Sequence, residues 1–179
     1  MPIASRYCPD CPLPPYSYVP GVAPHPTSDP RGHSYGARHP IVQPLDETSF
    51  ATNQNYLYAI DLFNHGFYWE AHEEWEGLWH AAGRTGPTAD FLKGLIKLAA
   101  AGVKLREGRA AGVKQHAQRS AELITLAAAS FAMHRIFGLC SDEIHNCALK
   151  TAKDFDQLVA GGQPDASRSL EFTLQLEAK

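Results

Sequence analysis

The stretch FYWEAHEEWEGLWH, residues 67–80, gathers side chains that bind metals and ligands into fourteen positions. It holds five aromatic residues, four glutamates and two histidines. On a helix, His72, Glu76 and His80 are spaced four residues apart and line one face, with Glu73 and Trp79 beside them. An imidazole and a carboxylate one turn apart can reach the same cation, so the spacing is compatible with a metal site.

A metal-dependent hydrolase is one interpretation of this stretch. HEEWE resembles the H-E-x-x-H motif of zinc proteases with the second histidine replaced by Glu76. In that case His72 and Glu76 are ligands of a divalent metal and Glu73 is the general base. His80 lies about 12 Å from His72 along a helix axis, too far to share the ion. The third ligand must come from another element, and the available histidines are His25, His33 and His116.

Two other interpretations need no metal. In the first, the helix is purely structural or mediates dimerisation, with Trp75 and Leu78 in the core and its glutamates favouring the helix dipole. In the second, which we favour, one face of the helix binds a ligand or a partner. That face consists of His72, Glu73, Glu76 and Trp79, with Lys97 on the following helix and His25 or His33 from the N-terminal segment.

Composition excludes several classes of function. The chain has 179 residues and a net charge of −3, and its Lys and Arg residues form no basic stripe, so nucleic-acid binding is not expected. Its longest apolar stretch is interrupted by Lys97 and Lys104, so we expect no membrane span. The first residues lack the apolar run of a signal peptide, which predicts a cytoplasmic protein.

The N-terminal 45 residues differ from the rest of the chain. Eleven of the thirteen prolines lie in residues 1–44, which prevents a long helix or a central strand. The segment is nevertheless rich in Tyr and His, whereas disordered segments are poor in aromatic residues. We therefore expect an extended strap on the domain surface, with turns at Pro20–Gly21 and Asp29–Pro30. A strap covering the 67–80 stretch would bring His25 or His33 near His72.

Residues 46–162 show helical periodicity and predict an all-α domain, a compact bundle of antiparallel helix hairpins. We expect about five helices. The first has candidate caps at Asp46, Thr48 and Ser49 and ends at Gly66. The others are expected at 67–82, 89–107, 110–130, and from a cap at Ser141 to Gly161.

The tail, residues 163–179, changes period. Leu170, Phe172, Leu174 and Leu176 alternate with polar residues, which is typical of a half-buried strand. A strand needs a partner. We expect it to pair with the strap near residues 39–45 or with a second subunit, which would make a homodimer.

Four cysteines complete the reactive residues. Cys8 and Cys11 form a C-x-x-C motif that is able to bind zinc or to cycle as a dithiol. A structural zinc site usually needs four ligands, and the chain has no second C-x-x-C. Cys140 and Cys147 are about 10 Å apart along a helix, too far for a disulfide, and are interpreted as small buried residues.

Two strings resemble a known family. Glu70, Ala71, His72, Glu73, Trp75, Glu76 and Trp79 carry the pattern E-A-H-E-x-W-E-x-x-W, and residues 91–101 carry F-L-x-G-L-I-x-L-A-A-A. Together they resemble the domain-of-unknown-function 309 family over roughly residues 56–126. The resemblance implies a compact all-α fold of antiparallel helix hairpins. It implies no activity and no cofactor, because the family has none assigned.

Overall fold

The computed structural model describes residues 6–37 and 42–177, and six α-helices make up half of these residues. They are α1 (Gln54–Asn64), α2 (Tyr68–Ala81), α3 (Pro87–Arg106), α4 (Ala110–Phe131), α5 (Ser141–Lys153) and α6 (Phe155–Leu158). A 3-10 turn, η1 (Phe50–Thr52), precedes α1, and a small antiparallel hairpin of β1 (Arg135–Ile136) and β2 (Leu139–Cys140) lies between α4 and α5. The predicted all-α class is confirmed.

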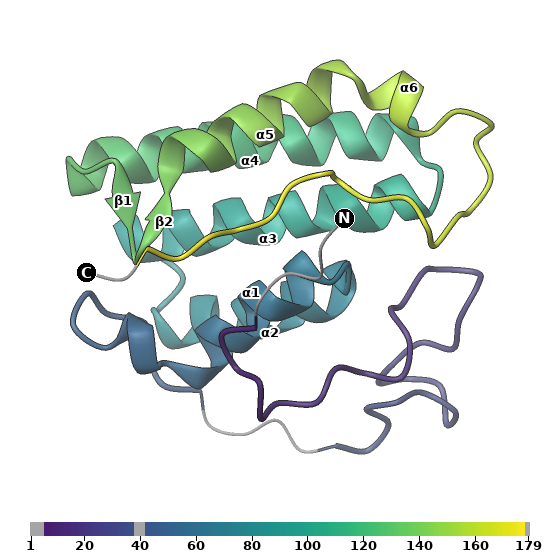
Figure 1. Cartoon of the computed structure of the whole chain (residues 1–179), viewed down its shortest axis with the longest axis horizontal. Helices are drawn as coiled ribbons and strands as arrows, with labels where there is room; N and C mark the ends of the chain where they lie inside the picture. The colour runs from purple at the N-terminus through teal and green to yellow at the C-terminus, as the bar shows by residue number, and fades with distance from the viewer. Residues whose placement is uncertain (1–5, 38–41, 178–179) are drawn as a thin grey trace.

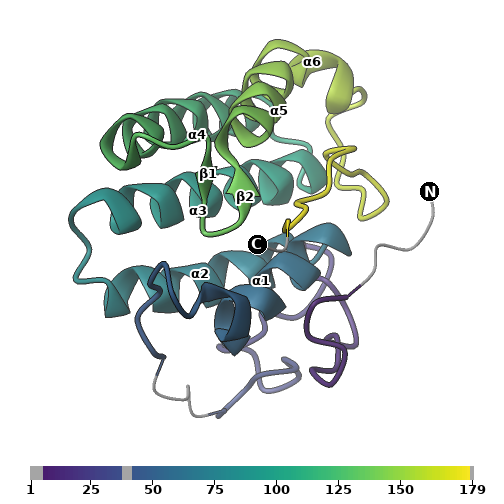
Figure 2. The same cartoon turned by 60° about the vertical axis from the view of Figure 1, so that its left-hand side comes forward.

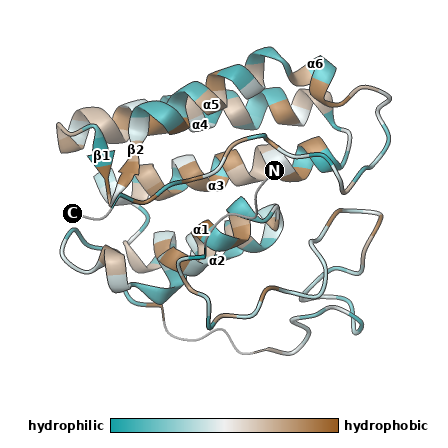
Figure 3. Cartoon of the chain, in the orientation of Figure 1, coloured by the Kyte–Doolittle hydropathy of each residue, from teal (hydrophilic) through white to brown (hydrophobic). Residues whose placement is uncertain are grey.

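The helices stack in chain order. Each of α1 to α4 packs on the helix that follows it, and the α3–α4 contact is the most extensive, which is the predicted arrangement of hairpins. Figures 1 and 2 show α4 and α5 on one side, α3 in the middle, and α1 with α2 on the other side. Figure 3 shows hydrophobic and hydrophilic positions alternating around each helix, as burial of one face requires. Within the described residues, no helix is long and apolar enough to cross a membrane.

The first helix begins later than the sequence predicts. Asn53 is its N-cap, and its side chain accepts a hydrogen bond from the Tyr56 amide at 3.1 Å. The predicted caps lie in the preceding turn, where Asp46 accepts bonds from the amides of Thr48 and Ser49. The prediction was wrong because Asx turns and N-caps use the same side chains and the same short-range bonds.

Helices α3 and α4 approach closely at a glycine. A Cβ on Gly94 would lie 2.6 Å from Cδ1 of Ile124, so no larger residue fits without movement. The Ser120 hydroxyl donates to the Gly94 carbonyl at 2.8 Å across the same contact. Both Ser120 and Ile124 are buried. This contact fixes α3, which carries Lys93 and Lys97, against α4.

The last predicted helix is two helices. Asp154 interrupts it, with α5 before and the single turn of α6 after. Ser141 is the first helical residue and not the cap; its hydroxyl donates to the His134 carbonyl at 2.9 Å and closes the β1–β2 hairpin. At the hairpin turn, Phe137 and Gly138 both have positive φ, as a two-residue type I′ turn requires.

The tail is extended but forms no strand within the described residues. Leu170 and Leu174 are buried while Glu171 and Gln175 are exposed, as the alternation predicts. The backbone amides of Leu170, Leu174 and Leu176 donate to side chains, respectively Tyr68 Oη, Asn64 Oδ1 and Tyr7 Oη.

The strand prediction for the tail is therefore wrong. The alternation of apolar and polar residues indicates which side chains are buried, but the tail amides bond to side chains and not to a neighbouring strand. Of the proposed pairing segment, residues 39–41 lie outside the described part. Because the tail amides are bonded within the chain, dimerisation through the tail gains no support and stays a prediction.

The strap is attached to the domain through a buried carboxylate. Asp61 of α1 is fully buried, and it accepts hydrogen bonds from the backbone amides of Tyr7 at 2.7 Å and Cys8 at 2.8 Å. The predicted turns are present, with bonds from Val22 N to Val19 O and from Gly32 N to Asp29 O. Figure 1 shows the strap running outside the α1–α2 layer.

The C-x-x-C motif at the start of the strap is closed. Cys8 and Cys11 are joined by a disulfide, which leaves no thiolate for zinc in this state. Disulfides are rare in cytosolic proteins, so the pair does not favour the predicted cytoplasmic location. Cys140 and Cys147 are free and half-buried, where the sequence predicted full burial.

Candidate functional site

Helix α2 presents three different faces, and its core face is the one that the sequence predicted. Ala71, Trp75 and Leu78 are fully buried and pack in the main hydrophobic core. Their spacing of three and four residues places them in one stripe along the helix. The remaining motif residues are divided between a face toward α3 and α4 and a face toward the strap.

The face toward α3 and α4 carries His72 and Glu76. Burial lowers the pKa of His72, Lys97 and Lys93 lower it further, and Glu76 acts in the opposite direction. The pKa of Lys97 is lowered by its partial burial, by Lys93 and by Arg119, against the attraction of Glu76. Lys97 and Glu76 therefore lie within electrostatic range of each other across the α2–α3 hairpin.

His116 extends this face onto α4. Burial lowers its pKa first, and the charges of Lys97, Lys104 and His72 lower it further. Two histidines and several cations thus lie within electrostatic range of one another, with Glu76 as the acid among the groups that act on His72. Such a face favours the neutral form of both histidines.

Trp79 lies at one end of this face. The ammonium group of Lys93 lies 3.8 Å from the centroid of the Trp79 ring, and the guanidinium of Arg84 lies 5.8 Å from it. Both are within the range of cation–π attraction. Arg84 also donates from Nε to His80 Nδ1 at 2.8 Å. The half-buried indole of Trp79 is therefore engaged by cations of its own chain.

The face toward the strap is organised by Glu70. His33 Nε2 lies 3.1 Å from Glu70 Oε1, and the Tyr18 amide donates to the same oxygen at 2.9 Å. His25 packs edge-on against Trp69 with ring centroids 5.2 Å apart. The strap covers α2 at Trp69 and Glu70, just before His72, and His25 and His33 contact α2 there.

The proposed metal ligands gain no third member in the described part of the chain. No group of three or more His, Cys, Asp or Glu residues there is arranged to hold a metal ion. His25 and His33 contact Trp69 and Glu70, while His72 contributes to the lowered pKa of His116. The donor set that a zinc hydrolase requires is therefore not assembled around His72 and Glu76 by these residues.

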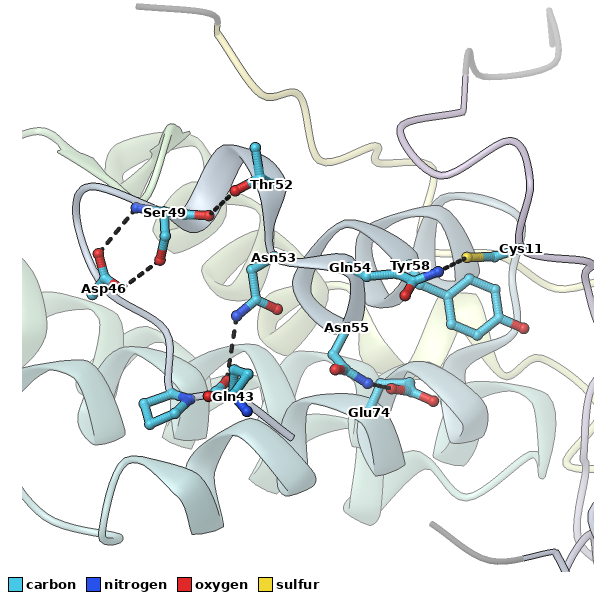
Figure 4. A pocket seen from close by; sticks show the side chains of 11 residues that line it. Cys11, Gln43, Asp46, Ser49, Thr52, Asn53, Gln54, Asn55, Tyr58 and Glu74 are labelled. Atoms are coloured by element: carbon cyan, nitrogen blue, oxygen red, sulfur yellow. Dashed lines mark hydrogen bonds between the residues drawn. The ribbon is translucent and has the colours of Figure 1, made fainter. Parts of the chain in front are cut away.

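Two pockets flank α1 and α2 on the strap side. The larger, of about 870 Å³, is shown in Figure 4 and is lined mainly by residues 43–55. There Asn55 of α1 points toward Glu74 of α2, and its amide donates to Glu74 Oε2 at 2.9 Å. Glu74 is the one residue of the 67–80 stretch among the lining residues described.

The second pocket, of about 430 Å³, lies between the strap and α2. We call it the strap pocket. Seven residues of the 67–80 stretch line it: Trp69, Glu70, Glu73, Glu74, Glu76, Gly77 and His80. From the strap come Pro14, Thr27, His33, Ser34, Ala37 and Val42, and from α1 Asn55, Tyr58 and Leu62. Of the predicted site residues, Glu73, Glu76 and His33 meet here, while His72, Trp79 and Lys97 lie on the other face.

Two buried charges important to this region were not predicted as functional. Glu70 was interpreted as one of several helix-stabilising acids, yet it is 5% exposed and binds the strap. Arg106, 8% exposed at the end of α3, donates to Ser17 Oγ at 2.8 Å, to the Gly66 carbonyl, and to the Arg168 carbonyl at 2.9 Å. It thereby joins the strap, the α1–α2 turn and the tail.

A weak signal for both residues exists in the sequence. Glu70 lies between Tyr68 and Ala71, and Arg106 follows Leu105, so each flanks the apolar stripe of its helix. Periodicity cannot separate a charge at the edge of a stripe from a solvated one, since burial depends on segments that pack there from elsewhere. The strap and the tail supply that cover.

Comparison with known proteins identifies a family for the helical hairpins. Residues 56–115 match the family model described as Domain of unknown function (DUF309). Residues 56–115 form a DUF309 domain. No curated protein and no solved structure matches the chain. The predicted resemblance is confirmed, over a somewhat shorter range than expected.

The DUF309 domain covers most of α1, all of α2 and α3, and the start of α4. It therefore contains the α2 wall of the strap pocket and, on the opposite face, His72, Lys93 and Lys97. His33 and Val42 belong to the strap, before the domain begins. The strap pocket is thus built partly by the DUF309 domain and partly by the extension that precedes it.

Proposed function

We propose that this DUF309 protein binds a small molecule in the strap pocket. The observation that carries the proposal is a pocket of about 430 Å³ lined by seven residues of one 14-residue stretch. Ligand sites in proteins are typically clefts of about 300–1,000 Å³ that combine aromatic walls with a few polar groups. Trp69 and Tyr58 supply aromatic surface, and Glu73 and His33 supply polar groups.

The residues that hold the two walls of the pocket in place favour a site that is already formed before a ligand binds. Its helical wall is held by the buried residues Ala71 and Trp75. Its strap wall is held by Glu70, which binds both His33 and the backbone of Tyr18. Binding residues on fixed elements lose less conformational entropy when a ligand arrives. The hydrolase alternative is not carried further, because the described residues do not complete a donor set around His72 and Glu76.

A filling variant tests the proposal. Gly77 lines the strap pocket from α2, and a Cβ placed there would lie 3.2 Å from Cγ2 of Val42. Gly77→Leu should project a branched side chain into the pocket, whereas Gly77→Ala adds a single methyl group. We expect metabolite screening by thermal shift to give compounds that stabilise the wild type, retain part of their effect on Gly77→Ala, and lose it on Gly77→Leu.

The size of the effect is set by mass action. A ligand present at a hundred times its Kd adds about 2.7 kcal/mol to the stability of the state that binds it. In a chain of this length, that raises Tm by about 5–10 °C. Ala129→Leu, at an exposed position of α4, is the control for adding a large side chain. If every stabilising compound acts equally on Gly77→Leu, the strap pocket is not the binding site.

A further inference from the structure

The strap pocket has one sign of charge. Four glutamates line it, Glu70, Glu73, Glu74 and Glu76, and its described lining residues include no lysine or arginine. Lys93 and Arg84, which are placed over Trp79, are not among the lining residues, although Arg84 donates to the lining residue His80. A cleft lined by acids concentrates the field of its charges and attracts positively charged molecules.

A buried oxygen in the pocket wall lacks a partner. Glu70 is 5% exposed; its Oε1 accepts from the Tyr18 amide and lies 3.1 Å from His33 Nε2. Its Oε2 has no hydrogen-bond partner among the described residues. A buried carboxylate oxygen without a donor is costly and calls for a donor from outside the chain. This observation concerns Glu70 at its contact with the strap, and it does not depend on how many glutamates line the pocket.

The aromatic residues of the pocket are suited to the same kind of ligand. Tyr58 and Trp69 line it together with the glutamates. Burial raises the pKa of Tyr58, and the carboxylates of Glu74, Glu70 and Asp61 raise it further against the opposing charge of Arg6. The phenol thus lies in a negative potential. Aromatic faces attract organic cations, and this attraction adds to that of the carboxylates.

We infer that the strap pocket binds a small organic ammonium ion, a primary amine or diamine, which donates to Glu70 and is attracted by the neighbouring glutamates. The inference rests on the proposed function and specifies its ligand. An ammonium group offers three donors on a compact cation. A bare metal ion is disfavoured, because no three donors in the described residues converge as its short bonds require. An anion would meet four carboxylates and no compensating cation in the described lining.

Three probes of one chain length test the sign of the charge. We would titrate 1,4-diaminobutane, 1,4-butanediol and succinate into the full chain, following Trp69 by the NMR signal of its indole N–H. The signal is assigned by its loss in Trp69→Phe. The expected result is a saturable shift with 1,4-diaminobutane, and none with butanediol or succinate. Calorimetry on the same samples gives the dissociation constants.

Variants locate the contact. Glu70→Gln should weaken binding of 1,4-diaminobutane, but this residue also holds the strap. Glu73→Gln is therefore the second variant, because Glu73 lines the pocket from a half-buried position. Loss of a charge-assisted contact should raise its Kd for the diamine about tenfold. Glu122→Gln, an exposed acid that pairs with Arg119 on α4, is the matched control and should leave the Kd unchanged.

The outcomes separate the two proposals. Binding of butanediol or succinate in the pocket, as tightly as the diamine, overturns the inference and leaves the proposed function standing. Equal Kd values for the wild type and Glu73→Gln also overturn it. If none of the three probes moves the Trp69 signal, the ammonium inference fails. The proposed function then fails as well only if the Gly77→Leu screen yields no pocket-dependent compound.

Discussion

His33 in the strap and Glu70 on α2 meet with 3.1 Å between Nε2 and Oε1, and both side chains are more than nine-tenths buried. The same carboxylate oxygen accepts a bond from the Tyr18 amide. A motif glutamate of the DUF309 domain therefore holds a segment that lies before the domain in sequence. Removing the carboxylate leaves the buried His33 ring and the Tyr18 amide without this hydrogen-bond partner.

Replacement of Glu70 should release the strap and destabilise the fold. We expect Glu70→Ala to lower the free energy of unfolding by about 2–6 kcal/mol, because the Tyr18 amide and the His33 ring each lose a buried partner at about 1–3 kcal/mol. Urea denaturation gives the energy, and limited proteolysis shows whether residues 18–37 become cleavable. Glu122→Gln, on the exposed surface of α4, should change neither. Unaltered proteolysis of Glu70→Ala would show that other contacts hold the strap.

Arg106 should couple the strap to the tail. Its guanidinium bonds Ser17 Oγ, the Gly66 carbonyl and the Arg168 carbonyl, and it lies 4.9 Å from the centroid of the Tyr68 ring. Arg106→Met keeps much of the volume but removes every donor, and we expect a loss of about 2–4 kcal/mol. Hydrogen exchange should increase in both segments together. Arg109→Met, at an exposed neighbouring position, is the control.

Asn64 should hold the tail in place of a neighbouring strand. Its side chain donates to the Leu174 carbonyl at 2.8 Å and accepts from the Leu174 amide at 2.7 Å. Asn64→Ala leaves both backbone groups of Leu174 unpaired, at a cost of about 1–3 kcal/mol. Hydrogen exchange of the Leu174 amide should accelerate. Asn146→Ala on α5 is the comparison, and equal protection of Leu174 in both variants would contradict the assignment.

Gly94→Ala should test the closeness of α3 and α4. A helix gains up to about 1 kcal/mol from alanine in place of glycine. Against this, the new Cβ would lie 2.6 Å from Cδ1 of Ile124, and overpacking typically costs about 1–3 kcal/mol. We expect net destabilisation, partly reversed by Ile124→Val. Gly112→Ala, whose Cβ would lie 2.9 Å from Cγ of Lys104, should cost less, because a lysine side chain at a half-buried position moves more easily than a packed isoleucine. Thermal denaturation of the four proteins gives the comparison.

The protein should lose stability as the pH falls below 6.5. Burial lowers the pKa values of His72 and His116 from the ordinary value of 6.5. The unfolded chain then binds protons more readily than the folded one, so the free energy of unfolding decreases with decreasing pH. His72→Gln and His116→Gln should each flatten this dependence between pH 7.5 and 5.5. His134→Gln, at an exposed position, should not.

Much of the fold follows from local pattern. Spacings of three and four residues identified the buried stripes, and Tyr56, Trp75, Leu92 and Val113 are all in the core. The cap of α1 was misplaced, because Asp46 and Asn53 carry the same short-range signal. The tail was assigned to a strand, because alternation of Leu170 to Leu176 reports burial and not the nature of the partner.

The candidate site was only partly predictable. The sequence placed His72, Glu73, Glu76 and Trp79 on one helix, and a helical wheel cannot tell which neighbours cover each side. The fold divides them, with His72 toward the cations of α3 and α4 and Glu73 toward the strap. Glu76 belongs to both sides, since it acts on His72 and also lines the strap pocket.

The sequence by itself determined the helices, their apolar stripes and the DUF309 motif, because these depend on residues three and four positions apart. The tertiary structure decided which charges are buried. Glu70 and Arg106 lie at the edges of their stripes and would be solvated on isolated helices; the strap and the tail cover them here. Burial of a charge depends on packing between distant segments, and local periodicity contains no information about that packing.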